Sequence, residues 1–161
     1  MQEFLEKLTS YNLFNNLLPG VIFAVFICEM LHVELLGDNL AKDFFVSYFI
    51  GLIINRFGSL VVEPVLRRIG FVEYAPYEDF VKASQKDPKI EIILESNNIY
   101  RTMSALFILV FVVIVYDQIS IKFPFLFDHK LSIISGLLLI LFLLSYRKQT
   151  EFIKKRVASS K

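Results

Sequence analysis

The sequence contains no tryptophan, one cysteine and two histidines, and its six glycines are scattered singly. A lone cysteine excludes a disulfide within the chain. The dispersed glycines exclude a phosphate-cradling loop, and no nucleophile elbow or paired metal-ligand motif is present. Glu29 and His32 form a single E-x-x-H motif, whereas di-iron bundles need it twice together with further carboxylates. We therefore expect a non-enzymatic protein with no metal and no cofactor.

A large excess of charge is also lacking, because 17 Lys and Arg residues face 16 Asp and Glu residues. This balance gives no indication of direct nucleic-acid binding. Hydrophobic residues make up 55% of the 161 residues, and they gather in four runs at 19–36, 44–66, 102–116 and 131–146. A membrane-spanning helix needs about 20 mostly apolar residues. The third and fourth runs are apolar on every face, which disfavours a soluble bundle with one apolar stripe per helix.

The predicted fold class is therefore all-α: a four-helix transmembrane bundle forming a single integral membrane domain over residues 1–161. The uneven distribution of basic residues predicts its orientation, because cytoplasmic segments carry the excess of Lys and Arg. One side receives three, namely Lys42, Lys122 and Lys130. The other receives thirteen, namely Lys7, Arg67, Arg68, Lys82, Lys86, Lys89, Arg101, Arg147, Lys148, Lys154, Lys155, Arg156 and Lys161. Both termini and the central loop are expected to be cytoplasmic.

Three segments outside the bilayer have distinct patterns. Residues 1–18 predict a short helix in the membrane interface, and residues 147–161 form a basic tail. Residues 67–101 predict a cytoplasmic helical hairpin or stalk, with one helix after Pro76 and a second from Pro88 to about Asp117. The stalk carries a stripe of partner-contact candidates that the preceding helix, a second copy or a partner protein would cover: Ile90, Ile93, Leu94 and Asn97. The aromatic external loop at 117–130 is expected to dip into the headgroup zone.

The second span carries an unusual polar stripe. Asn55, Ser59 and Glu63 recur at helical spacing, with Arg56 beside them and Tyr48 nearer the external side. Ionisable residues within a span are costly and by default face the bundle interior or a water-filled space. Small residues close to this stripe permit close helix approach: Ser47, Gly51 and Gly58. The stripe therefore predicts either an assembly surface or a pore lining, and spacing alone leaves both open.

A pairing within this region follows from the short connection between the first two spans. Counting outward from that connection places Glu29 opposite about Gly51, one turn from Arg56. We therefore predict an Arg56–Glu29 ion pair, within one chain or across a subunit boundary. Glu63 and Arg67 also have the i, i+4 spacing of a helical ion pair, at the cytoplasmic end of the span. The neighbouring Pro64 predicts a kink or an end of the helix there.

The run YFIGLIINRFGSLVVEPVLRRIGFVEYAPYEDFVKASQKDPKIEIILESNNIYRT resembles small bacterial four-span proteins, some of which accompany anti-phage defence genes. The membrane component of Kiwa-type systems has this size and span number. The resemblance is one of architecture, and no site residues are carried over. It implies a bacterial inner membrane and a cytoplasmic partner.

Two functions stay open at the level of sequence. The first is a self-assembling scaffold or effector subunit, bound to membrane lipids, that holds or senses a cytoplasmic protein. The alternative is an oligomeric ion channel lined by the polar face of the second span. A third class, a lipid-active enzyme or transporter, has no supporting motif.

Overall fold

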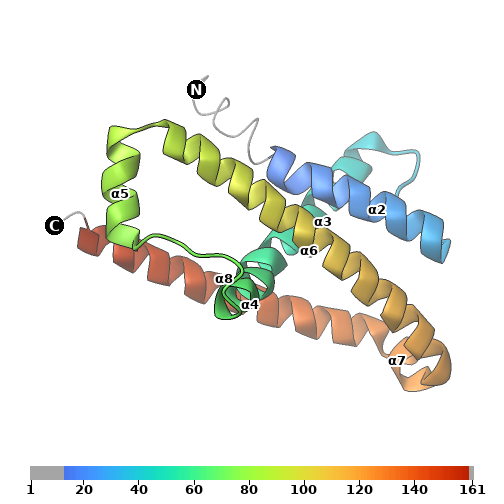
Figure 1. Cartoon of the computed structure of the whole chain (residues 1–161). Helices are drawn as coiled ribbons and strands as arrows, with labels where there is room; N and C mark the ends of the chain where they lie inside the picture. Colours follow the sequence, from blue (N-terminus) through green and yellow to red (C-terminus); the bar gives the residue numbers. More distant parts are fainter. Residues whose placement is uncertain (1–12, 160–161) are drawn as a thin grey trace.

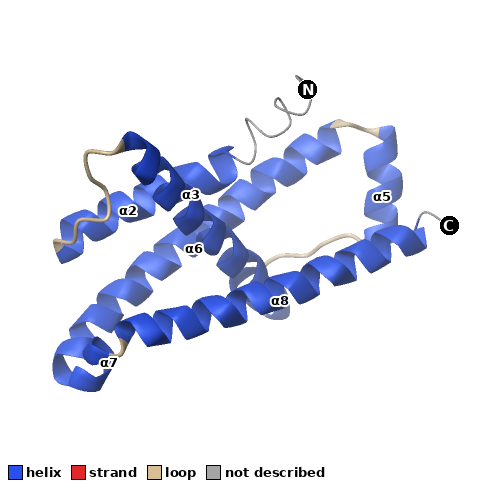
Figure 2. Ribbon diagram, turned by 180° about the vertical axis from the view of Figure 1, so that it is seen from behind, coloured by secondary structure: helices blue, strands red, loops and turns tan. Residues whose placement is uncertain are grey.

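The computed structural model describes residues 13–159, and over that range its secondary structure is helical with no strand (Figures 1 and 2). Within the described range, four helices are long and apolar enough to cross a membrane. They comprise Leu13–Leu31, Leu40–Arg68, Lys89–Lys122 and Lys130–Ser159. The prediction of an all-α protein with four candidate membrane spans is confirmed.

The first span starts earlier and ends earlier than the sequence predicts. It consists of a π-helical turn, η1 (Leu13–Leu17), followed by α2 (Leu18–Leu31). Residues 13–18 therefore belong to the span and not to an interfacial helix, and residues 1–12 lie outside the described range. At the other end, His32 adopts a left-handed conformation with φ of 51°, which stops the helix before the connecting segment 32–39.

The second span continues through the predicted break at Pro64. It runs as α3 (Leu40–Phe57), a second π-helical turn η2 (Gly58–Val62) and α4 (Glu63–Arg68). Proline removes a backbone donor, and its ring crowds the carbonyl four residues earlier. The wider π-helical turn ends at Val62, two residues before Pro64, and the backbone N–H of Glu63 donates to the carbonyl of Gly58. The helix is widened ahead of the proline and does not end at it.

Small residues bring the first two spans into backbone contact. A Cβ atom added at Gly20 would overlap the carbonyl of Ser47, and one added at Gly51 would overlap the backbone of Asn16. Gly58 lies close to the third span, but less tightly: a Cβ added there would be 3.2 Å from the Cβ of Ala105. The predicted role of Ser47, Gly51 and Gly58 in close helix approach is confirmed.

Two predicted helices form the segment between the second and third spans. The first is α5 (Tyr77–Lys86), and the second is α6 (Lys89–Lys122), which continues into the third span. The carboxylate of Asp87 accepts a hydrogen bond of 3.0 Å from the N–H of Lys89 and so caps α6. At 1.5 Å per residue, α6 is about 50 Å long, which exceeds the ~30 Å hydrocarbon core.

The connection between the last two spans is more helical than expected. α6 extends to Lys122, and a short helix, α7 (Pro124–Asp128), precedes α8 (Lys130–Ser159). The hydroxyl of Tyr116 donates a 2.6 Å hydrogen bond to the carbonyl of Leu126 and holds α7 against α6. The aromatic side chains of this segment stay exposed, as an interfacial position requires: Phe123, Phe125 and Phe127.

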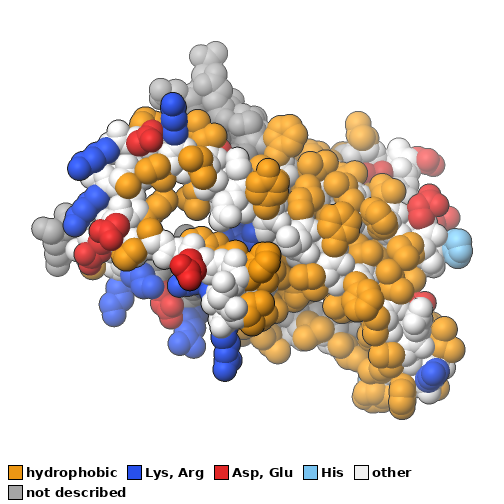
Figure 3. Space-filling view, viewed as in Figure 1, with side chains coloured by type: hydrophobic (Ala, Val, Ile, Leu, Met, Phe, Trp, Pro, Cys, Tyr) orange, Lys and Arg blue, Asp and Glu red, His pale blue; other side chains and the backbone are white. Residues whose placement is uncertain are grey.

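The apolar core lies where the second and third spans meet. It is formed by Ile54, Val62, Ala105, Leu106 and Val110. The last span contributes little, since only 6% of its most apolar stretch is buried, compared with 22–33% for the other three. Figure 3 shows hydrophobic side chains over the middle of the molecule, while most charged ones gather around α5 and the C-terminal part of α8. This distribution is typical of a chain with its middle in lipid.

Candidate functional site

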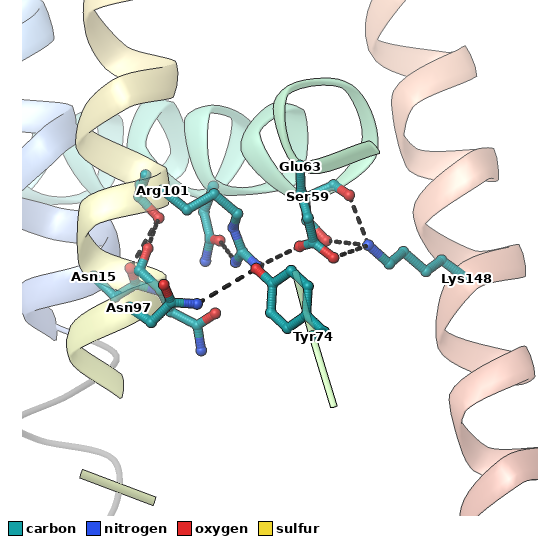
Figure 4. A network of polar contacts seen from close by, with 10 residues as sticks. Asn15, Ser59, Glu63, Tyr74, Asn97, Arg101 and Lys148 are labelled. Carbon is teal, nitrogen blue, oxygen red and sulfur yellow. Dashed lines mark hydrogen bonds and ion pairs between the residues drawn. The ribbon is translucent and has the colours of Figure 1, made fainter. Parts of the chain in front are cut away.

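A buried polar network is the main candidate site, and Arg101 of α6 lies at its centre (Figure 4). The Nη1 atom of Arg101 donates to a carboxylate oxygen of Glu63 at 2.8 Å, and its Nη2 atom donates to the side-chain oxygen of Asn55 at 3.1 Å. The side chains of Arg101 and Glu63 are only 16% and 15% exposed. The remaining nitrogen, Nε, is buried without a hydrogen-bond partner in residues 13–159. One arginine thus links α6 to both α3 and α4.

Asparagines extend the network into the first span. The amide nitrogen of Asn55 donates to the side-chain oxygen of Asn16 at 3.0 Å, and the amide nitrogen of Asn16 lies 3.5 Å from the hydroxyl of Tyr48. Beside them, the hydroxyl of Thr102 donates to the side-chain oxygen of Asn15 at 2.9 Å. Asn15 and Asn16 are 4% and 5% exposed. Buried amides are costly without partners, so these bonds fix the start of the first span against α3 and α6.

Lys148 brings the fourth span into the same network. Its ammonium group donates to the carbonyl of Ser59 at 2.6 Å and to the Ser59 hydroxyl at 2.8 Å. It also lies 3.9 Å from the second carboxylate oxygen of Glu63. Figure 4 shows the lysine reaching from α8 across to η2 and α4. The network therefore joins all four spans, with two cations arranged around one carboxylate.

Three predicted stripe residues converge in this network, but their partners differ from those expected. Asn55, Ser59 and Glu63 each contact another span. The predicted Glu63–Arg67 pair is absent from the described residues, because the Glu63 carboxylate faces Arg101 and Lys148 instead. The Arg67 guanidinium lies over the ring of Tyr74, 5.3 Å from its centroid. Cations on other helices replace the local i, i+4 partner.

The predicted Arg56–Glu29 pair does not form within the chain. Glu29 is exposed, Arg56 is half-buried, and neither makes an ion pair in the described part of the chain. The physical reason is the register of the first two spans: Gly20 packs on Ser47 and Asn16 packs on Gly51. This register places Glu29, which lies near the end of the first span, closer to the start of α3 than to its middle. Contact between Arg56 and Glu29 across a subunit boundary stays a prediction.

The predicted partner-contact stripe is only partly covered. Ile90 and Leu94 are half-buried, whereas Ile93 is 66% exposed. Asn97 is exposed, and its amide donates a 3.4 Å hydrogen bond to the hydroxyl of Tyr74. The segment before α5 therefore covers one end of the stripe, while the isoleucine stays open.

Sequence reasoning missed five members of the network: Asn15, Asn16, Arg101, Thr102 and Lys148. The sequence pattern places Asn15 and Asn16 in the interfacial segment 1–18, Arg101 in the cytoplasmic stalk and Lys148 in the basic tail. One signal was available for the asparagines, since two adjacent amides directly before an apolar run need partners wherever the run is buried.

The polar groups of the network bond mainly to one another. They comprise one carboxylate, one guanidinium group, one lysine amine, amides and hydroxyls. Among residues 13–159, no three His, Cys, Asp or Glu side chains gather where they could hold a metal ion. Comparisons of the chain with known protein families, curated proteins and solved structures find no match.

Proposed function

We propose that this chain is a non-enzymatic multi-pass protein of a bacterial inner membrane that self-assembles and acts as a scaffold or effector subunit for a cytoplasmic protein. The observation that carries the proposal is that the polar stripe of the second span bonds to the other spans. Its amide, hydroxyl and carboxylate groups bond to the other three spans of the same chain. Such a network acts as a clamp that sets one arrangement of the helices.

The uncovered fourth span supports self-assembly. Its apolar side chains stay exposed along its length, including Leu137 at 62%, Leu139 at 62% and Leu143 at 59%. In a membrane either lipid or protein covers such a face. Small residues promote helix association there, and α8 carries Ser132 and Gly136 one turn apart, with nothing within 4 Å of an added Cβ at the glycine.

The hairpin of α5 and the start of α6 supports a role in holding a partner. Ile92, Ile93 and Tyr100 on α6 are 63%, 66% and 72% exposed. The basic residues of α5 and of the C-terminal part of α8 favour a cytoplasmic position for this end of the molecule, where a soluble protein is the natural cover for these side chains. A role in anti-phage defence is also part of the proposal, and it rests on the resemblance in size and span number alone.

Disulfide crosslinking in native membranes tests self-assembly through α8. In a Cys28→Ser background, Leu139→Cys should form a covalent dimer on mild oxidation, because the side chain faces outward. Ser145→Cys is the matched control, since Ser145 lies on the same helix but is only 9% exposed. Monomers alone from Leu139→Cys and from Leu143→Cys, together with a monomeric mass in nanodiscs, would reject assembly through this face.

An ion channel is the second candidate function. The observation that favours it is the lack of an ion-pair partner for Arg56 within residues 13–159. Arg56 is half-buried and makes no ion pair in the described chain, so it is free to face a water path between copies. Ion flux into liposomes that depends on Arg56, with an intact oligomer in Arg56→Ala, would favour the channel over the scaffold.

A further inference from the structure

A charged cavity lies next to the polar network, between the end of the second span and the last helix. Its volume is about 720 Å³, within the range of ligand pockets. Its walls come from η2 and α4 on one side and from α8 on the other. The two sides contact each other through the hydrogen bonds of Lys148 to Ser59, and Phe49 stacks on Phe142 further along the same two spans.

The charges of the cavity are arranged on two facing helix surfaces. On α8, the lining residues Arg147, Lys148, Glu151 and Lys155 follow helical spacing, while Lys154 and Arg156 lie outside the lining. On α4, Arg67 and Arg68 face them. Five cationic side chains thus line a space that holds two carboxylates. Basic residues that only anchor a helix in the headgroup region need no such concave arrangement.

The two carboxylates are already engaged. Glu63 pairs with Arg101 at 2.8 Å, and Glu151 pairs with Arg147 at 3.3 Å. Arg67, Arg68 and Lys155 have no carboxylate partner in the described chain. The cavity therefore has a surplus of positive charge that an anionic ligand would neutralise. Guanidinium groups match phosphate oxygens in geometry, and lysine adds a further charge-assisted hydrogen bond.

The apolar part of the lining indicates where the phosphate comes from. Leu60 and Leu144 lie at the end of the cavity nearer the middle of the spans, and Arg68 and Lys155 lie toward the ends of their helices. Charged groups at one end and leucines at the other match a phosphate group attached to acyl chains. We propose that this cavity binds the phosphate headgroup of an anionic phospholipid from the leaflet that holds the C-terminal part of α8. The headgroup bridges α4 and α8 and thereby fixes the last span.

This assignment goes beyond the proposed scaffold function and does not depend on it. Within the described chain, Lys148 provides the polar contacts between α8 and the second span. A bound phosphate adds a second bridge through Arg67 or Arg68 on one side and Lys155 on the other. Lipid binding should therefore raise the thermal stability of the protein, and the rise should grow with the logarithm of the lipid concentration above the dissociation constant.

Native mass spectrometry and thermal unfolding of the full chain in neutral detergent test the proposal, with phosphatidylglycerol and phosphatidylcholine as the lipid probes. Phosphatidylglycerol should bind more tightly and raise the unfolding temperature more. The variant Arg67→Gln/Arg68→Gln/Lys155→Gln should weaken its binding about tenfold or more, since even one charge-assisted hydrogen bond commonly contributes that much. The control Lys82→Gln/Lys154→Gln/Arg156→Gln removes three charges outside the cavity and should leave binding within about twofold.

A third probe, sn-glycerol 3-phosphate, separates the two sources of a phosphate group. Displacement of phosphatidylglycerol by this soluble phosphate at equal concentration would uphold the phosphate site and overturn the lipid as its natural ligand. Equal binding of the two lipids, or equal weakening in both triple variants, would overturn the site itself. If the triple variant fails to fold, Arg68→Gln compared with Lys154→Gln carries the same test, because neither side chain belongs to the polar network.

Discussion

Glu63 accepts from Arg101 and lies near Lys148, so one carboxylate balances cations from two other helices. Removing a member of a buried ion pair leaves the remaining charge uncompensated. Removing both members avoids that penalty. The stability of the network therefore depends on the matching of its members more than on the strength of any single contact.

Glu63→Ala and Arg101→Ala should each lower the free energy of unfolding by about 3–5 kcal/mol. The double variant should lose less than the sum of the two, because the two residues are coupled. Denaturation in detergent, followed by circular dichroism, measures these changes. Glu151→Ala is the control: its pair with Arg147 is 58% and 77% exposed and should change stability by no more than about 0.5 kcal/mol. Strict additivity of the two variants would contradict the network.

Glu29 and Arg56 should show no energetic coupling within one chain, unlike Glu63 and Arg101. Since they do not pair within the chain, Glu29→Ala and Arg56→Ala should have additive effects on monomer stability, within about 0.5 kcal/mol. The same cycle measured on the assembled protein in nanodiscs distinguishes the remaining possibility. Coupling that appears only in the oligomer would place the two residues in contact across a subunit boundary.

At the scale of residues, the sequence predicts the polar stripe of the second span but not the partners of that stripe. Helical spacing identified Asn55, Ser59 and Glu63 because all three lie on one face of a single helix. Their partners Arg101 and Lys148 escaped notice because counting charges assigns a cation to the nearest loop. The reach of a long side chain back toward another span leaves no trace in local sequence. Asn15 and Asn16 were missed for a related reason, since their partners lie 87 and 39 positions further on, respectively.

At the scale of helices, the length of the apolar runs is enough to locate the spans. It does not predict the register between them. The third and fourth spans are recognisable because their central runs contain no charge. The register of the first two depends on where α2 ends, and the left-handed His32 that ends it gives no distinct sequence signal. An error of five residues at that end moves Glu29 away from Arg56.

The close packing of η1 on α3 predicts the effect of glycine substitutions. Gly51→Ala should destabilise the protein by about 1–3 kcal/mol or more, because the new methyl group meets rigid backbone of Asn16. Gly136→Ala is the matched control within a helix, with nothing within 4 Å of the added atom. It should be neutral or stabilising by up to about 1 kcal/mol, given the higher helix propensity of alanine. Thermal unfolding compares the two, and equal effects would contradict the close packing.

Across the whole molecule, charge and apolar surface divide the chain into zones. Hydrophobic side chains cover the middle, and basic ones concentrate around α5 and the C-terminal part of α8 (Figure 3). The polar network lies on the side of the apolar core where the second span ends, next to the charged cavity. The clamp between the spans is thus placed close to the end where we propose that a lipid headgroup and a cytoplasmic partner bind.

The orientation of the chain follows from the same distribution and is open to direct measurement. Because basic segments stay in the cytoplasm, α5 should be cytoplasmic and α7 external. In a Cys28→Ser background, a membrane-impermeant thiol reagent should label Phe127→Cys in intact spheroplasts, where Phe127 is 57% exposed. Gln85→Cys on α5 should be labelled only after the membrane is permeabilised. The reverse pattern would invert the orientation and move the polar network and the cavity to the external leaflet, whereas labelling of both cysteines in intact spheroplasts would contradict the assignment of four spans.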